Sequence, residues 1–168
     1  MRTAEVLVAC AASVGCTVGT VETSGSELDE ALLDRVESYH ATAKINAQPY
    51  TSDLGPFKIN CYVTGDVAAY RKIHPDRAGA NVTVASGTVI VREVLDEKGQ
   101  VSKLTIMAKG PPGYDPSLGD WWFGVTDPRG TPLMQNGAVQ LGRLVQCHDC
   151  HLDRSRDDFL FGVPGGGA

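Results

Sequence analysis

Two strand-like segments joined by a short turn limit the folds open to this chain. Residues 88–95 read Thr-Val-Ile-Val-Arg-Glu-Val-Leu, a run rich in β-branched side chains that favours a strand. Apolar and polar residues alternate along residues 101–109, as in a strand with one buried face. The intervening Asp-Glu-Lys-Gly at 96–99 is typical of a turn. This pattern predicts a β-hairpin and argues against an all-helical bundle.

Further patterns add strands and helices on either side of this hairpin. Alternating or aromatic residues predict strands at 57–64 and 120–125. Ser26 can cap a helix, with Asp29 reaching back as in a capping box, and the apolar spacing continues this helix to about Lys44. Shorter helices are expected at 67–73 and 138–145, with one helical turn at 157–161. The fold class predicted is therefore α+β, a mainly antiparallel β-sheet flanked by helices.

The ends of the chain differ in composition from its middle. Residues 1–16 combine an early Arg2 with an apolar stretch and small residues before Cys16, which indicates a signal peptide or a lipoprotein leader lipidated at Cys16. Residues 17–26 are rich in Gly, Ser and Thr and predict a linker. A domain is expected over 27–164, and residues 165–168 form a Gly-rich tail that we expect to be flexible. The formal net charge of -5 argues against a nucleic-acid-binding surface.

The chemistry-bearing motif is Cys147-His-Asp-Cys-His151, a C-x-x-C-H sequence. Two thiols three positions apart can reach both vinyl groups of one haem, and the following histidine can then coordinate the iron. This predicts one covalently attached haem c, bound through Cys147 and Cys150, with His151 as the metal ligand. The alternatives are a zinc site, a thioredoxin-like redox pair and a chance occurrence.

The position of the motif narrows the kind of haem protein. Only 17 residues follow His151 and none is methionine, so the usual downstream methionine ligand of an electron-transfer cytochrome c is missing. Cytochrome c′ has a motif near its C-terminus, but it is a four-helix bundle, and this sequence is too rich in β-branched residues and turns for that fold.

Over residues 57–164 the sequence resembles the cytochrome P-460 family, which includes the β-sheet cytochromes c′. The residues that carry the resemblance are 87–94 (Gly-Thr-Val-Ile-Val-Arg-Glu-Val), Gly119-Asp-Trp-Trp122, the C-x-x-C-H motif and 157–161 (Asp-Asp-Phe-Leu-Phe). The resemblance implies a homodimer, a haem lying against an antiparallel sheet, and a pocket for a small ligand opposite the iron-binding histidine.

The same resemblance makes Arg92 a candidate for the distal pocket. Arg92 stands where hydroxylamine-oxidising members carry the lysine that is linked to the porphyrin, and a guanidinium is a poor nucleophile. Arg92 would then hydrogen-bond an iron-bound ligand, or else pair with Glu93, Asp96 or a haem propionate. Lys109 is an alternative for the cross-link. His40, His74 and His148 are alternative iron ligands, and Met107 and Met134 are expected in the core or a loop.

Taken together, these patterns predict a periplasmic or lipid-anchored protein with a high-spin, five-coordinate haem iron. It would bind nitric oxide or another small nitrogen-oxide ligand, and if it is an enzyme it would be an oxidoreductase acting on nitric oxide or hydroxylamine. The main alternative is a six-coordinate electron-transfer cytochrome that serves a redox partner protein. A second alternative is a zinc-binding protein without haem.

Overall fold

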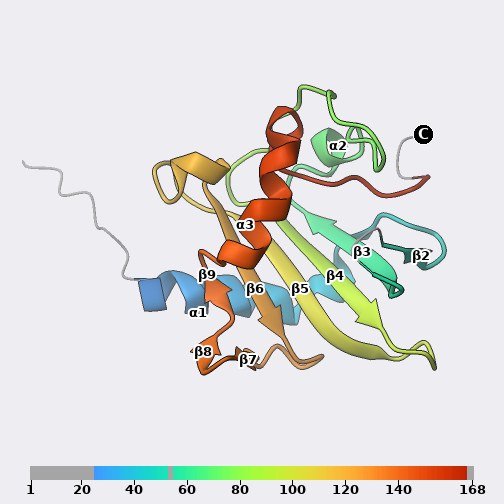
Figure 1. Ribbon diagram of the computed structural model, residues 1–168, viewed down its shortest axis with the longest axis vertical. Coiled ribbons are helices and arrows are strands. Elements are labelled where there is room, and N and C mark those ends of the chain that lie inside the picture. Colours follow the sequence, from blue (N-terminus) through green and yellow to red (C-terminus); the bar gives the residue numbers. More distant parts are fainter. Residues whose placement is uncertain (1–24, 53–54, 166–168) are drawn as a thin grey trace, which may run out of the picture.

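The computed structural model describes residues 25–52 and 55–165, and the leader and most of the linker lie outside these ranges. Its centre is an antiparallel sheet, and the predicted α+β class is confirmed (Figure 1). The four long strands are neighbours in chain order: β3 (Lys58–Thr64), β4 (Val89–Leu95), β5 (Val101–Lys109) and β6 (Trp121–Thr126). Short strands extend the two edges: β1 (Ala43–Lys44) and β2 (Tyr50–Thr51) both pair with β3, and β9 (Leu141–Gly142) pairs with β6.

Each face of the sheet is covered by a different part of the chain (Figure 1). On one face, α1 (Gly25–Glu37) packs Leu32 and Val36 against Val91, Ile106 and the other residues of one apolar cluster. On the opposite face, α3 (Val145–His151), the 3-10 helix η3 (Leu152–Asp157) and the C-terminal segment pack against a second cluster. Successive residues of the long strands therefore face different partners, and both faces are buried.

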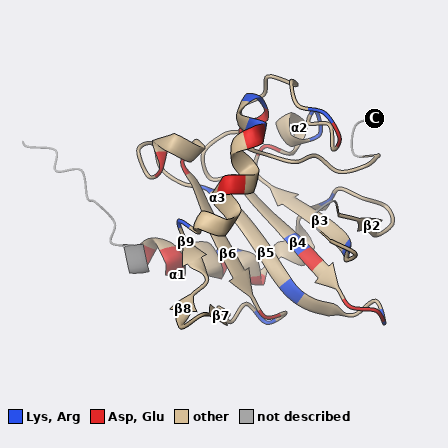
Figure 2. Ribbon diagram, in the orientation of Figure 1, with Lys and Arg blue, Asp and Glu red and all other residues tan. Residues whose placement is uncertain are grey.

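Charged residues are concentrated in helices and loops, but β4 places a basic and an acidic residue side by side within the sheet (Figure 2). Arg92 faces the side of α3, and Glu93 faces the side of α1. The buried Glu93 carboxylate accepts hydrogen bonds from Tyr39 Oη and Asn60 Nδ2, each at 2.8 Å. Glu93 is thus satisfied on its own face.

The predicted strands are confirmed to within one residue, whereas several predicted helices are wrong in extent. The helix expected to reach Lys44 ends at Glu37 and is followed by the 3-10 helix η1 (Tyr39–Ala41) and by β1. The capping box expected of Ser26 and Asp29 stays a prediction, and the Asp29 carboxylate accepts a hydrogen bond from Trp122 Nε1 at 2.7 Å. The helix α2 (Val67–Tyr70) is shorter than expected. The turn at 157–161 lies earlier, as η3, because Asp158 and Phe159 have positive φ.

The helix expected at 138–145 is wrong. A small hairpin of β7 (Met134–Gln135) and β8 (Ala138–Val139) lies there instead, followed by β9. Asn136 and Gly137 join the two strands with φ of 53° and 78°, the conformation of the two-residue turns that favour Asn-Gly. The 3-10 turn η2 (Pro116–Leu118) lies in the loop before β6, and no helix in the described ranges is long and apolar enough to cross a membrane.

Candidate functional site

The helix α3 gathers the three residues of the C-x-x-C-H motif. Cys147, Cys150 and His151 are three and four positions apart, so a helix brings them to one side. The Cys147 side chain packs against the second cluster, Cys150 is exposed and His151 is buried. Neither cysteine is in a disulfide. Both thiols are therefore free, on the same side of the helix as the imidazole.

The imidazole of His151 is held in one orientation. Its Nδ1 lies 2.5 Å from the carbonyl oxygen of Phe159, and the rings of Phe123 and Phe161 contact it at centroid distances of 5.4 and 5.1 Å. Because a carbonyl only accepts, the proton lies on Nδ1, and Nε2 carries a free lone pair. Within the described ranges Nε2 has no hydrogen-bond partner. This is the arrangement of a histidine ready to bind a metal through Nε2.

The surroundings of His151 also keep it neutral. The pKa of His151 is lowered from 6.5 to about 4, mainly by burial; the hydrogen bond to Phe159 opposes this shift, and the nearby cations Arg92 and Arg154 add to it. The imidazole is therefore uncharged at neutral pH. Only the neutral form can donate a lone pair to a metal.

A small cavity of about 100 Å³ lies between His151 and the sheet. Ile90, Met107 and Phe123 supply apolar walls, and Arg92 and Thr105 supply polar groups. The sheet residues come from β4, β5 and β6, so the long strands set one wall and α3 sets the other. The cavity is smaller than the about 300–1,000 Å³ typical of sites for organic ligands.

Arg92 stands beside this cavity without the protein partners that the sequence suggested. Its guanidinium donates to the carbonyl oxygen of Phe161 at 2.8 Å, and Glu93 faces the other side of the sheet. In the described part of the chain Arg92 forms no ion pair with a carboxylate, so pairing with Glu93 or Asp96 is wrong. Arg92 keeps a positive charge next to His151.

The residues around α3 have the chemical groups that hold a haem, but the cavity between α3 and the sheet is small for one. The two thiols, the free Nε2 and an apolar wall match the donor set of a covalently held haem. Arg154 Nη1 is buried without a hydrogen-bond partner, which leaves a cationic donor for an anionic ligand. The cavity of about 100 Å³ is too small for a porphyrin.

The pKa of Cys147 bears on the redox-pair and zinc alternatives. Burial raises the pKa of Cys147 to about 11, with a further contribution from Cys150. A thioredoxin-like nucleophile needs a lowered pKa, and zinc binds thiolates. Among residues 25–52 and 55–165, no group of three or more His, Cys, Asp or Glu side chains is arranged to hold a metal ion.

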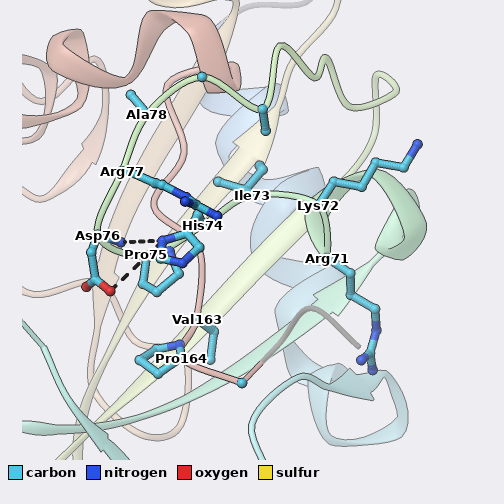
Figure 3. Close-up of a pocket in the computed structure, with 13 residues that line it drawn as sticks. Arg71, Lys72, Ile73, His74, Pro75, Asp76, Arg77, Ala78, Val163 and Pro164 are labelled. Carbon is cyan, nitrogen blue, oxygen red and sulfur yellow. Dashed lines mark hydrogen bonds and ion pairs between the residues drawn. The ribbon is translucent and has the colours of Figure 1, made fainter.

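A hollow of about 840 Å³ lies elsewhere on the surface and contains none of the motif residues (Figure 3). It is lined by the loop after α2 and by residues 163–165. His74 lies in it, and its Nδ1 accepts a hydrogen bond from the amide of Asp76 at 3.1 Å. The proton of a neutral His74 is then on Nε2, so this ring presents a donor where His151 presents a lone pair.

The remaining sequence candidates lie in different parts of the structure. Lys109 forms a buried ion pair with Asp158 at 2.5 Å and lies over the Trp121 ring, so its ammonium is already engaged. The side chains of His40 and His148 lie near carboxylates, of Glu93 and Asp149 respectively. Met134 is exposed on β7, whereas Met107 lines the cavity beside His151.

Three residues of this site were not identified from the sequence as functional: Arg154, Phe159 and Phe161. Phe159 and Phe161 belong to the stretch 157–161 that carries part of the family resemblance, and Arg154 follows His151 by one helical turn. That spacing is the signal that marks Arg154. A comparison with protein-family models found no match for the chain, and a comparison with curated proteins also found none.

Proposed function

We propose that the chain is a mono-haem c-type cytochrome of the cytochrome P-460 type, whose haem iron binds a small nitrogen-oxide ligand such as nitric oxide. The observation that carries the proposal is the state of His151. Its Nδ1 is fixed by Phe159, its pKa of about 4 keeps it neutral, and two free thiols share its side of α3. A histidine held in this way is a ready axial ligand.

The roles of the three motif residues follow from their chemistry. Each thiol of Cys147 and Cys150 would hold the haem by adding across one vinyl group, with sulfur bonding to one carbon, hydrogen going to the other, and no electrons lost or gained. His151 would hold the iron through Nε2. The bound haem supplies an iron that can exchange electrons and take up a diatomic ligand.

The residues on the sheet side of the cavity would determine which small ligand the iron can accept. Ile90 and Phe123 exclude water, and Arg92 can donate a hydrogen bond to an oxygen or nitrogen atom of a ligand. A five-coordinate iron with an open position next to Arg92 follows if no side chain reaches the metal. Arg92 is in this account the distal residue.

A six-coordinate electron-transfer cytochrome is the second candidate, and one observation favours it. Met107 lines the same cavity as Arg92 and His151, and its thioether is a ligand that raises the reduction potential of a haem. A His151–Met107 pair would close the iron to gases. A redox partner protein would then replace the small ligand as the functional partner.

Hydroxylamine oxidation through a lysine–haem cross-link receives less support. Arg92 occupies the matching strand position, and the ammonium of Lys109 is held by the carboxylate of Asp158. A protonated, paired amine is not a nucleophile. The chain therefore lacks a free lysine at the position where the family resemblance places one.

The proposal includes an extracytoplasmic location. A signal peptide at 1–16, or a lipid anchor at Cys16, would carry the chain to the periplasmic side of a bacterial membrane, where c-type haems are attached. A homodimer is part of the same proposal, by resemblance. Fractionation of cells and light scattering of the purified protein test these two points.

Optical spectra of the chain expressed with a haem-attachment system test the function. We expect a c-type spectrum with a high-spin oxidised form, and a reduced form that shifts on addition of carbon monoxide. A reduced form that is unchanged by carbon monoxide would favour the His151–Met107 alternative. A broad, strongly red-shifted band would favour a cross-link and hydroxylamine oxidation.

A further inference from the structure

Arg92 lines two cavities of the molecule. One is the cavity beside His151, and the other has a volume of about 140 Å³. This second cavity, here called the outer cavity, is formed by β2 together with Ser52, by residues 75–76 and by the chain at 161–164. Arg92 is the residue that the two cavities share.

The guanidinium of Arg92 lies at the wall of the outer cavity. Its Nη2 donates to the carbonyl oxygen of Phe161 at 2.8 Å, and Phe161 itself lines this cavity. The hydroxyl of Tyr70 donates to the same carbonyl oxygen at 3.0 Å. That oxygen is then fully used, whereas a guanidinium has several more N–H groups to donate. Arg92 can therefore bind a further acceptor.

The residues packed around Arg92 give it no negative charge. Cys61 is its register partner on β3, and Tyr70 interacts with it as well. Burial raises the pKa of Cys61 and raises that of Tyr70 well above its ordinary value, so both are neutral at pH 7. Among residues 25–52 and 55–165, no carboxylate lies within ion-pair distance of Arg92. A mostly buried charge without a counter-charge is costly, so an anion beside Arg92 is favoured.

Asp76 is the carboxylate that lines the outer cavity in the described part of the chain. Its side chain is 75% exposed, and its Oδ2 lies 4.0 Å from Nδ1 of His74 (Figure 3). It therefore stands in water beside the imidazole and does not neutralise Arg92. Because its negative charge repels other anions, an anion with one charge is favoured here over an anion with two.

The size and the polar groups of the outer cavity limit the kind of anion further. A volume of about 140 Å³ holds roughly four water-sized groups of about 30 Å³ each. Tyr50, Thr51 and Ser52, which all carry hydroxyl groups, line the cavity together with Arg92. A planar oxyanion matches such a site, because two of its oxygen atoms can accept parallel hydrogen bonds from one guanidinium.

We infer that the outer cavity binds a small planar oxyanion with a single negative charge, the size of nitrate or formate, through Arg92. This site goes beyond the proposed function: it needs no haem, and the cavity that receives the anion exists without movement of α3 or η3. An inorganic oxyanion and a small carboxylate present the same pair of oxygen atoms, so the test includes both.

The test titrates the full chain, produced with the haem-attachment system, with nitrate and with formate in a calorimeter at constant ionic strength. We expect one anion per chain, and the tighter of the two names the source of the ligand. Chloride is the comparison, because it has the charge but not the pair of oxygen atoms. No binding of either oxyanion, or equal affinity for chloride and both oxyanions, would overturn the inference.

Two substitutions separate binding at Arg92 from a general attraction to positive charge. Arg92→Gln should weaken oxyanion binding by at least about tenfold, since it removes charge-assisted hydrogen bonds. Arg77→Gln is the matched control, because Arg77 is exposed on the neighbouring hollow and the variant loses the same charge. It should change the affinity by less than about twofold, since salt screens exposed charges. Equal losses in the two variants would contradict binding at Arg92.

Two leucine substitutions decide between the cavities, and they carry the test if Arg92→Gln does not fold. Ser52→Leu fills the outer cavity and should abolish oxyanion binding. Thr105→Leu places the same side chain in the cavity beside His151 and should leave this binding unchanged. A loss in Thr105→Leu but not in Ser52→Leu would move the anion to the cavity beside His151 and would overturn the inference.

A carboxylate outside the described residues is tested in the same titration. Asp53 follows Ser52 in the sequence and is not among residues 25–52 and 55–165. Equal oxyanion binding by Asp53→Asn and the unaltered chain is the expected result. Binding by Asp53→Asn alone would mean that the chain supplies its own anion to Arg92, and the inference would then be wrong.

Discussion

The Nδ1 atom of His151 lies 2.5 Å from the carbonyl oxygen of Phe159, eight residues farther along the chain. The chain reverses between them because Asp158 and Phe159 adopt positive φ values of 54° and 62°. This reversal is tied to the sheet, since Trp121 Nε1 donates to the carbonyl oxygen of Asp158 at 2.7 Å. The orientation of the imidazole is therefore set by the backbone of a segment that is anchored to β6.

Replacing His151 should change the iron without releasing the haem. In the haem-loaded protein, His151→Ala removes the axial ligand but leaves both thioethers, so we expect covalent haem with an altered oxidised spectrum and a changed midpoint potential. His148→Ala is the control, because His148 lies inside the motif next to Asp149. Identical spectra for His151→Ala and the unaltered protein would exclude His151 as the ligand.

The pKa of His151 predicts how the haem-free chain responds to acid. The folded state holds this pKa at about 4, below the ordinary 6.5, so the unfolded state binds more protons between these values. Stability should therefore be unaffected by this group above pH 6.5 and fall by about 3 kcal/mol as the pH drops to 4. Urea unfolding measures the loss, and His151→Gln should reduce it. An equal loss in both proteins would contradict the assignment.

The distal side of the cavity predicts opposite results for two substitutions. If the iron is five-coordinate, Arg92→Leu should weaken the binding of nitric oxide or an anion by about tenfold, the effect of one charge-assisted hydrogen bond, while Met107→Leu should change little. If Met107 is an axial ligand, Met107→Leu should instead open the iron to carbon monoxide. Unchanged affinities in Arg92→Leu would remove Arg92 from the distal pocket.

The bond between Asp29 and Trp122 predicts a cost for separating α1 from the sheet. Trp122 is fully buried, so Asp29→Ala leaves its Nε1 without a partner and should lower the free energy of unfolding by about 1–3 kcal/mol. The neighbouring, exposed Glu30 provides the control, and Glu30→Ala should change stability by less than about 0.5 kcal/mol. Thermal or urea unfolding of the two variants measures these changes. Equal losses of unfolding free energy in the two variants would contradict the hydrogen bond between Asp29 and Trp122.

Most of the sheet could be predicted because its strands carry their own pattern. Alternating and β-branched residues predicted β3 to β6 closely, and the bounds of β5 are confirmed. The helix expected at 138–145 does not form, because Asn136-Gly137 makes the turn of a hairpin and the residues after it pair as a strand. The end of α1 also could not be predicted, since β1, which follows soon after it, is fixed by pairing with β3, a contact distant in sequence.

The candidate site divides in the same way. Cys147, Cys150 and His151 are contiguous, so their spacing alone predicts their chemistry. The carbonyl of Phe159 reaches His151 because Asp158 and Phe159 adopt positive φ. No local sequence pattern predicts positive φ at these two residues. The face of Arg92 depends on strand register, and its contact with Phe161 joins residues 69 positions apart. Tertiary packing, and not local sequence, decides such contacts.

The central claim, a haem held by Cys147 and Cys150, is tested most directly by intact-mass spectrometry under denaturing conditions. The chain is produced with a haem-attachment system, alongside the Cys147→Ala/Cys150→Ala double variant and the Cys61→Ala variant as a control for the buried cysteine. The account predicts one haem per chain in the unaltered protein and in Cys61→Ala, and none in the double variant. An unaltered chain that carries no covalent haem, made beside a cytochrome that does, would contradict it.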